Sequence, residues 1–338
     1  MTKDIIKIVN TREEDYIAIT YFPTDICNFD CTYCFPGSHP SKYRYRKDTD
    51  FVIDNFKKLF AFYKLKFNKS KIYFEIAGGG EPTLWPDLLK FCKEIKKVPD
   101  LSIALVCNGS RTIRWWNTII PYIDEVMLSY HNEFTKTEHY INVADLIWEN
   151  GKKVNAMVLM DYPNWDKCID AIEQMKQSKY NWFINAKEVV TAPGHDVESY
   201  TLEQKEYLKQ PIKRLPDSNY ILNNLEDYRM VESVAILDNE KVVTAGPNYY
   251  LINSINNFKG WECSVISEKI TIFPSGKITG SCNIDFDYNL NLYSKTLEKD
   301  LEQIISPHVT CTMNCCACLS DNHITKSKPT KTIELVPL

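Results

Sequence analysis

The chain has no long hydrophobic run. No window approaches 18 uncharged apolar residues, which argues against a membrane-spanning helix. The first fifteen residues, MTKDIIKIVNTREED, are charged and lack the apolar segment of a secretory signal. A charge excess is missing as well: 40 Lys and Arg against 44 Asp and Glu give a net charge of −4, which does not favour nucleic acid or an anionic membrane as partner. These absences predict a cytoplasmic globular protein.

What the chain does contain is an unusual number of cysteines. Twelve cysteines occur in 338 residues, with three in residues 27–34 and six in residues 263–318. A disulfide framework belongs to small secreted chains, so thiolate-bound metal in a reducing compartment is the better interpretation. The two groups predict two metal sites.

The first group lies in the stretch CNFDCTYC, residues 27–34. Unrelated buried thiols and disulfides are two alternatives, but three thiols at this spacing favour a metal site. Three ligands without an obvious fourth nearby fit an iron–sulfur cluster with one open iron better than a closed zinc site.

Six β-type runs alternate with helical patterns between residues 16 and 190. Most are nearly continuous apolar stretches, which is typical of parallel strands covered on both faces. A doubly wound α/β sheet fits this order, but a sheet curled into a partial barrel places all six strand ends around one mouth. The predicted strands are residues 16–22, 71–77, 101–107, 125–131, 153–160 and 182–190.

A glycine-rich motif follows the second predicted strand. It reads AGGGEPTLWP and contains Gly78, Gly79, Gly80 and Glu81. Consecutive glycines let the backbone approach a ligand closely, and a carboxylate beside them can meet an ammonium group. By itself the motif is equally typical of an ordinary strand-to-helix turn.

Together the two motifs resemble the signature of the radical S-adenosylmethionine (SAM) enzymes. That signature is Cys-x3-Cys-x2-Cys after the first strand, with an aromatic residue before the third cysteine, and Gly-Gly-Glu-Pro after the second strand. The resemblance covers roughly residues 15–190. It implies a 4Fe–4S cluster held by Cys27, Cys31 and Cys34, whose fourth iron chelates SAM, and an external one-electron reductant such as flavodoxin or ferredoxin.

The resemblance also implies a SAM site and a radical reaction. A 5′-deoxyadenosyl radical formed from SAM abstracts hydrogen from the substrate. His131 is a weak candidate for contact with substrate or SAM, and Lys187 for pairing with the SAM carboxylate, although a surface role suits that lysine better. The residues that match the family's SAM-binding positions are Tyr33, Phe35, Gly78, Gly79, Gly80, Glu81, Asn108, Ser110 and Ser129.

The second cysteine group resembles the twitch domain, the smaller relative of the SPASM domain, which binds an auxiliary 4Fe–4S cluster. Cys263 precedes and Cys282 follows a predicted hairpin around residues 274–276. The resemblance implies these two ligands together with Cys316 and Cys318, and Cys311 or Cys315 can replace either of the latter. A zinc site is the alternative, and a spare thiol such as Cys311 is a candidate hydrogen donor to a product radical.

The predicted architecture is therefore a partial (β/α)6 barrel over residues 1–230, followed by a linker and a twitch-type domain over residues 231–338. A segment of about 15 residues before the first barrel strand is too short for a leader-peptide recognition domain, which favours a sugar, nucleoside or similar small substrate. The auxiliary cluster suggests oxidation or rearrangement. Epimerisation or crosslinking of a ribosomal peptide is the first alternative. A non-enzymatic iron–sulfur electron carrier is the second, and the glycine motif argues against it.

Overall fold

The structure is a computed structural model. It describes residues 4–10, 15–34, 48–189, 200–208, 233–245, 253–280, 288–316 and 323–329, together with residues 212 and 250. Within this part of the chain, every helix is too short or too polar to cross a membrane.

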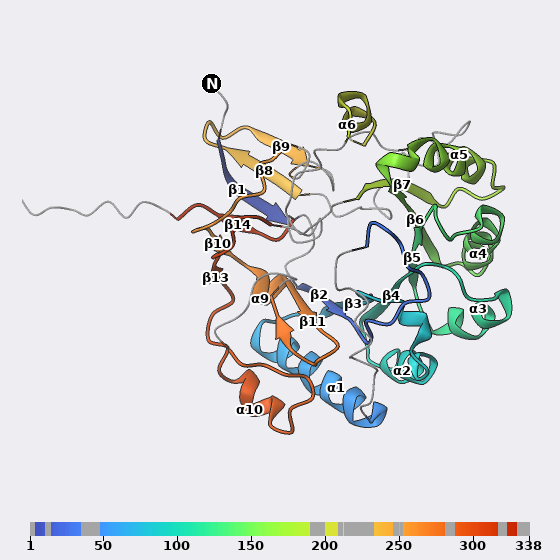
Figure 1. The fold of residues 1–338 in the computed structure, drawn as a ribbon. Coiled ribbons are helices and arrows are strands. Elements are labelled where there is room, and N and C mark those ends of the chain that lie inside the picture. Colours follow the sequence, from blue (N-terminus) through green and yellow to red (C-terminus); the bar gives the residue numbers. More distant parts are fainter. Residues whose placement is uncertain are drawn as a thin grey trace, which may run out of the picture.

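An eight-stranded sheet forms the centre of the molecule (Figure 1), with the order β12-β11-β2-β3-β4-β5-β6-β7. Six neighbouring strands are parallel and follow one another in sequence, as in a partial barrel. All six strands predicted from the sequence are present, with ends that agree within two residues. The strands are β2 (Tyr16–Tyr21), β3 (Lys71–Ile76), β4 (Leu101–Cys107), β5 (Glu125–Tyr130), β6 (Lys153–Met160), β7 (Phe183–Glu188), β11 (Lys269–Ile272) and β12 (Ile278–Thr279).

Helices cover the outer face of this sheet in an arc (Figure 1). The apolar side chains on one face of α1 are buried, and Cys92 and Cys168 lie in the core. In α5 the second half of the apolar face is fully buried, whereas Trp165 and Ile169 lie at the edge of the core. The helices are α1 (Thr49–Lys66), α2 (Leu88–Ile95), α3 (Ile113–Ile119), α4 (Thr137–Glu149), α5 (Trp165–Lys176), α6 (Leu202–Leu208), α9 (Val265–Glu268) and α10 (Leu297–Leu301), with 3-10 turns η1 (Pro82–Leu84), η2 (Ile120–Tyr122) and η3 (Tyr162–Asn164).

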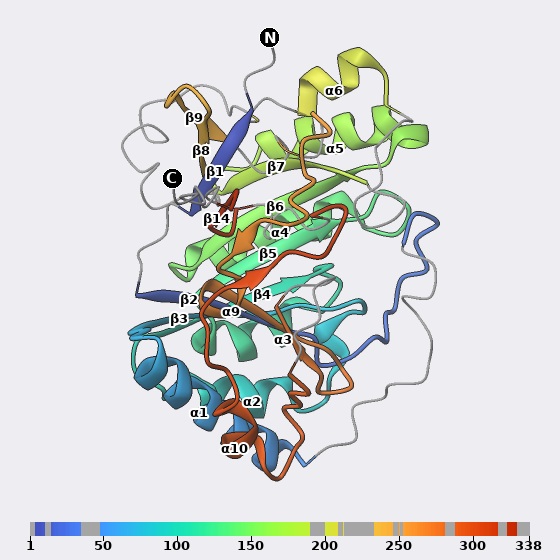
Figure 2. The ribbon, with the colours of Figure 1, turned by 90° about the vertical axis from the view of Figure 1, so that its left-hand side faces the viewer.

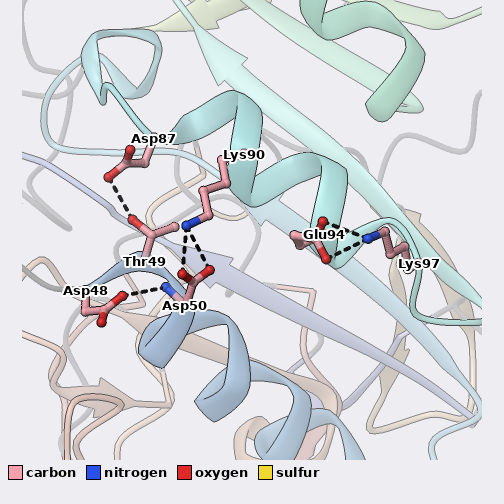
Figure 3. Close-up of polar contacts among 7 residues, drawn as sticks. All are labelled: Asp48, Thr49, Asp50, Asp87, Lys90, Glu94 and Lys97. Atoms are coloured by element: carbon pink, nitrogen blue, oxygen red, sulfur yellow. Dashed lines mark hydrogen bonds and ion pairs between the residues drawn. The ribbon is translucent and has the colours of Figure 1, made fainter.

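Polar contacts fix the start of α1 against α2 (Figure 3). The Asp48 carboxylate caps α1 by accepting a hydrogen bond from the Asp50 amide at 2.9 Å. The Thr49 hydroxyl donates to Asp87 at 2.7 Å, and Lys90 pairs with Asp50 at 2.8 Å. The ion pair is exposed and contributes little, so burial of the apolar helix faces provides most of the stability.

A second sheet lies beside the first and is antiparallel (Figure 2), in the order β13-β10-β14-β1-β8-β9. Its strands come from both ends of the chain: the N-terminal β1 pairs with β8 and with β14. The strands are β1 (Ile5–Asn10), β8 (Ser233–Leu237), β9 (Val242–Ala245), β10 (Glu262–Cys263), β13 (Val309–Thr310) and β14 (Lys326–Ser327).

The predicted hairpin is present, but it extends the barrel sheet. β11 pairs with β12 in antiparallel fashion and with β2 in parallel fashion, and Gly276 takes the positive φ of +84° that the turn requires. The predicted boundary at residue 230 remains a prediction. Two strands lie across it, however, because β11 joins the first sheet and β1 joins the second.

Candidate active site

The three cysteines of the first group lie on the loop that leaves the C-terminal end of β2. Cys27, Cys31 and Cys34 are free and half-buried. The Cys34 amide donates to the Cys31 carbonyl at 3.0 Å, and the Phe29 amide donates to the Cys27 sulfur at 3.3 Å. One short turn therefore presents three thiols at the end of the parallel sheet, which is the donor set that an iron–sulfur cluster with one open iron needs.

The electrostatic surroundings keep two of these thiols protonated in the metal-free protein. Burial raises the pKa of Cys27, and Glu81 raises it further. Burial and the nearby Glu133 carboxylate raise the pKa of Cys31 to about 12. A metal centre bound by thiolates at this loop would therefore have to displace these protons.

The glycine motif lies directly against the start of the cysteine loop. A Cβ on Gly80 would stand 2.4 Å from the Asp25 carbonyl carbon and 2.4 Å from the Ile26 oxygen, and a Cβ on Gly78 would stand 3.1 Å from the Thr24 oxygen. The sequence predicts a close approach of this backbone to a ligand. The structure shows a close approach to the protein's own backbone, one residue before Cys27. Contact of Gly78, Gly79 and Gly80 with SAM stays a prediction.

The Glu81 carboxylate braces the same region. Glu81 is only 2% exposed. Its carboxylate accepts hydrogen bonds from the Thr83 backbone amide at 3.0 Å, from the Thr83 hydroxyl, and from the Asn108 backbone amide at 2.7 Å. Burial raises the pKa of Glu81, and these hydrogen bonds oppose that rise. One carboxylate oxygen of Glu81 therefore connects the ends of β3 and β4, and the other accepts the local bonds from Thr83; the predicted contact of Glu81 with the SAM ammonium stays a prediction.

The predicted residues of strands β4 and β5 also gather at this edge. The Asn108 side-chain amide donates a hydrogen bond to the Asn28 side-chain oxygen at 3.0 Å. The Asn28 side-chain nitrogen donates in turn to the Ser110 hydroxyl, also at 3.0 Å. Ser129 lies on the adjacent strand and is half-buried. The structure therefore brings Asn108 and Ser110 against the cysteine loop, while contact of Ser129 with this site stays a prediction.

His131 follows β5 and contacts the cysteine loop directly. Its Nδ1 atom lies 3.4 Å from the Cys31 sulfur and 3.1 Å from the Tyr33 hydroxyl, and the rings of Tyr33 and His131 are nearly parallel, with an angle of 8° between them. Burial and the positive charge of Lys187 lower the pKa of His131 to about 4, so the imidazole is neutral at physiological pH.

Two residues that the sequence reasoning missed also hold the loop. Glu133 accepts hydrogen bonds from the Thr32 amide at 2.9 Å and from its hydroxyl, and Phe29 stacks on Phe134 with ring centroids 5.2 Å apart. Glu133 and Phe134 closely follow β5, the fourth barrel strand, and this position in the sequence could have identified them as site residues. Three predicted site residues lie outside the described part of the chain: Phe35, Cys282 and Cys318.

Three of the C-terminal cysteines lie in or beside the second sheet: Cys263 in β10, and Cys311 and Cys316 after β13. Cys263 stands directly opposite Val309 of β13 and Lys326 of β14, and directly opposed residues point to the same face. Val309 packs in the same apolar cluster as Cys311 and Cys316. Cys263 itself lies in the barrel core cluster, against which Val309 also packs, so the described residues place Cys311 and Cys316 in one cluster and Cys263 in the neighbouring one.

A β-bulge that contains Gly260 lies opposite Cys311, next to the paired strands β10 and β13. The Gly260 amide donates to the Cys311 carbonyl at 2.7 Å, and the Cys311 amide donates to the Trp261 carbonyl at 2.8 Å, with Gly260 at a positive φ of +81°. Among the residues that the structure describes, no three His, Cys, Asp or Glu side chains are grouped closely enough for a single metal ion.

The chain is similar to curated proteins over part of its length. It is 25% identical over 246 residues to a GTP 3′,8-cyclase from Mannheimia succiniciproducens, which is 64% of this chain and 71% of the cyclase. It is 32% identical over 108 residues to GTPase Obg from Brachyspira hyodysenteriae, but spans only 15% of that protein. It covers 49% of a second GTP 3′,8-cyclase, from Actinobacillus succinogenes, at 28% identity.

Solved structures and family models give the final comparison. The structure of native anSMEcpe with bound AdoMet and Cp18Cys peptide aligns with a TM-score of 0.51 and 15% identity, over 86% of this chain and 80% of that one, which indicates a shared fold. The model of the radical SAM superfamily matches residues 21–178. This match covers just under half of the chain and includes the cysteine loop and the glycine motif.

Proposed function

We propose that the chain is a radical SAM enzyme that acts at the cysteine loop on a small, polar, nucleotide-like or sugar-like substrate. Cys27, Cys31 and Cys34 would hold the 4Fe–4S cluster, which together with SAM and an electron from an external reductant supplies a 5′-deoxyadenosyl radical. The observation that carries the proposal is the set of three free thiols on one loop at the C-terminal end of a parallel sheet. That edge is where parallel barrels place their active sites.

The chain's own residues position this chemistry. Gly80 and Glu81 fix where the cysteine loop begins, and the Asn28–Asn108 hydrogen bond ties it to the end of β4. The neutral His131 imidazole contacts both Cys31 and Tyr33. Because these groups are held by buried and part-buried hydrogen bonds, they would orient the reacting partners.

The inner face of the sheet supports a polar substrate. The register places Glu75 opposite Thr20, whose hydroxyl donates to the Glu75 carboxylate at 3.0 Å. Asn185 and Lys187 continue the same face on β7, opposite Met157 and Leu159. A barrel filled only by its own core shows mainly Val, Ile and Leu here. The similarity to the GTP 3′,8-cyclases favours a nucleotide among polar substrates.

The function is tested by anaerobic incubation of the reconstituted enzyme with SAM, dithionite and one candidate at a time: GTP, other nucleotides, nucleosides, sugars and a cysteine-containing peptide. We expect 5′-deoxyadenosine in every case, with a substrate-dependent increase and a new product mass for one of the small polar compounds. Absence of 5′-deoxyadenosine would contradict the proposed activity. A new mass only with the peptide would contradict the substrate class.

We further propose a second 4Fe–4S cluster in the C-terminal region, which would aid oxidation or rearrangement of the substrate. Cys263 and Cys282 would contribute two ligands, and two of Cys311, Cys315, Cys316 and Cys318 would contribute the others. Two observations support this proposal: Cys311 and Cys316 lie in one apolar cluster, and Val309, which stands opposite Cys263, packs against that cluster as well.

The iron content tests the number of clusters. Anaerobic reconstitution of the full chain is expected to give about eight iron and eight sulfide ions, because two 4Fe–4S clusters contain that number. A variant with Cys27, Cys31 and Cys34 all changed to Ala is expected to retain roughly half. Stoichiometric zinc together with a failure of this variant to take up iron would show that the second site is not an iron–sulfur site.

A further inference from the structure

Lys326 is a buried lysine on the face that carries the C-terminal cysteines. Its side chain belongs to β14 and the residue is only 3% exposed. Lysine is almost never buried to this degree unless negative charge or hydrogen-bond acceptors surround it, because removing an ammonium group from water is costly. The position of Lys326 therefore requires an explanation from its surroundings.

The contacts of the ammonium group include a sulfur atom and an aromatic ring. The Nζ atom lies 3.6 Å from the Cys316 sulfur and 4.5 Å from the centroid of the Phe258 ring. Lys326 also stands directly opposite Cys263, so the two side chains share one face. The Lys326 amino group therefore lies against the Cys316 thiol and on the same sheet face as Cys263.

We propose that the Lys326 ammonium raises the reduction potential of the cluster held by these thiols. The inference rests on the proposed second cluster. Four thiolates give such a cluster a net negative charge, and uptake of one electron makes that charge larger. A cation a few ångströms away in a buried site stabilises the more negative form. Lys326 is thus a positioning residue that tunes the site, and we assign it no contact with substrate.

The test measures this potential where only the second cluster is present. The full chain carrying Cys27→Ala, Cys31→Ala and Cys34→Ala is reconstituted anaerobically and titrated with dithionite, with the reduced cluster followed by electron paramagnetic resonance. In this background Lys326→Met is expected to shift the midpoint potential to a more negative value, whereas Lys326→Arg is expected to leave it close to that of the unchanged lysine.

Lys328→Met is the matched control. Lys328 lies two residues along the chain, with its Nζ atom 5.7 Å from the Trp261 ring centroid and 3.4 Å from Asp4, and its side chain is 40% exposed. Solvent screens this charge, so its removal is expected to leave the potential unchanged. A shift in this control as large as that of Lys326→Met would overturn the assignment to Lys326.

The remaining outcomes separate the two proposals. If the triple-alanine background takes up no cluster, the second cluster itself is refuted and the role of Lys326 with it. If the cluster forms and Lys326→Met titrates at the original potential, the inference is overturned while the second cluster stands. If Lys326→Met takes up no cluster, the Lys326→Arg variant is decisive. A cluster in Lys326→Arg at the original potential supports the need for a positive charge at this position. Loss of the cluster in Lys326→Arg as well overturns the inference.

Discussion

Replacing Cys31 by Ala is expected to abolish the formation of 5′-deoxyadenosine from SAM. Cys31 is the central thiol of the loop, and its sulfur also contacts His131 at 3.4 Å. Removing one of three thiolates leaves the cluster without a complete set of ligands. Changes to outer-shell partners alone cost metal sites about 10–100-fold, so loss of a ligand should reduce the rate at least about 100-fold. Chromatography of anaerobic reactions measures the product directly.

Cys92→Ala is the matched control for this variant. Cys92 lies in α2 and is fully buried in the helix layer, so the substitution removes a thiol of the same size and leaves only a small cavity. We expect Cys92→Ala to lose some stability but to keep its iron and its 5′-deoxyadenosine formation. Wild-type rates in Cys31→Ala would show that the cysteine loop does not hold the reactive cluster.

Replacing Gly80 by Ala is expected to remove iron from the first site as well as to prevent SAM cleavage. The new methyl group would meet the Asp25 carbonyl carbon and the Ile26 oxygen at 2.4 Å, and these are backbone atoms that cannot rotate away. The loop must therefore move at the residue before Cys27. Overpacking of this kind costs about 1–3 kcal/mol. Iron analysis of the reconstituted variant is expected to show a loss of roughly half, the share of one of two clusters.

Gly151→Ala separates this displacement from ordinary backbone strain. Gly151 has a positive φ of +71°, so alanine there costs about 1–2 kcal/mol, but no atom lies within 4 Å of the added methyl group. This control is expected to lower the melting temperature and to keep the full iron content. If Gly80→Ala instead keeps its iron and only binds SAM more weakly, the glycine serves the ligand and not the cysteine loop.

Much of the barrel could be predicted because its strands carry a local signal. Runs such as residues 101–107 are nearly continuous in apolar side chains, which is the pattern of a strand covered on both faces, and the structure places β4 at those residues. The buried face of α1 follows from helical spacing in the same way. The cysteine spacing alone indicated the first metal site, since all three thiols come from one loop.

The tertiary structure alone decided which distant segments meet. The hairpin strand β11 was predicted as a strand, but only the fold shows that it pairs with β2. Gly80 was predicted to serve a ligand, and the fold shows that it lies against Asp25, 55 residues earlier in the chain. The sequence alone does not indicate a role for Lys326, and only the pairing of β14 with β10 shows that it stands opposite Cys263. The spacing of residues in the sequence indicates which face of a helix or strand a side chain occupies. Which other segment packs on that face depends on strand pairing and on packing between segments far apart in sequence.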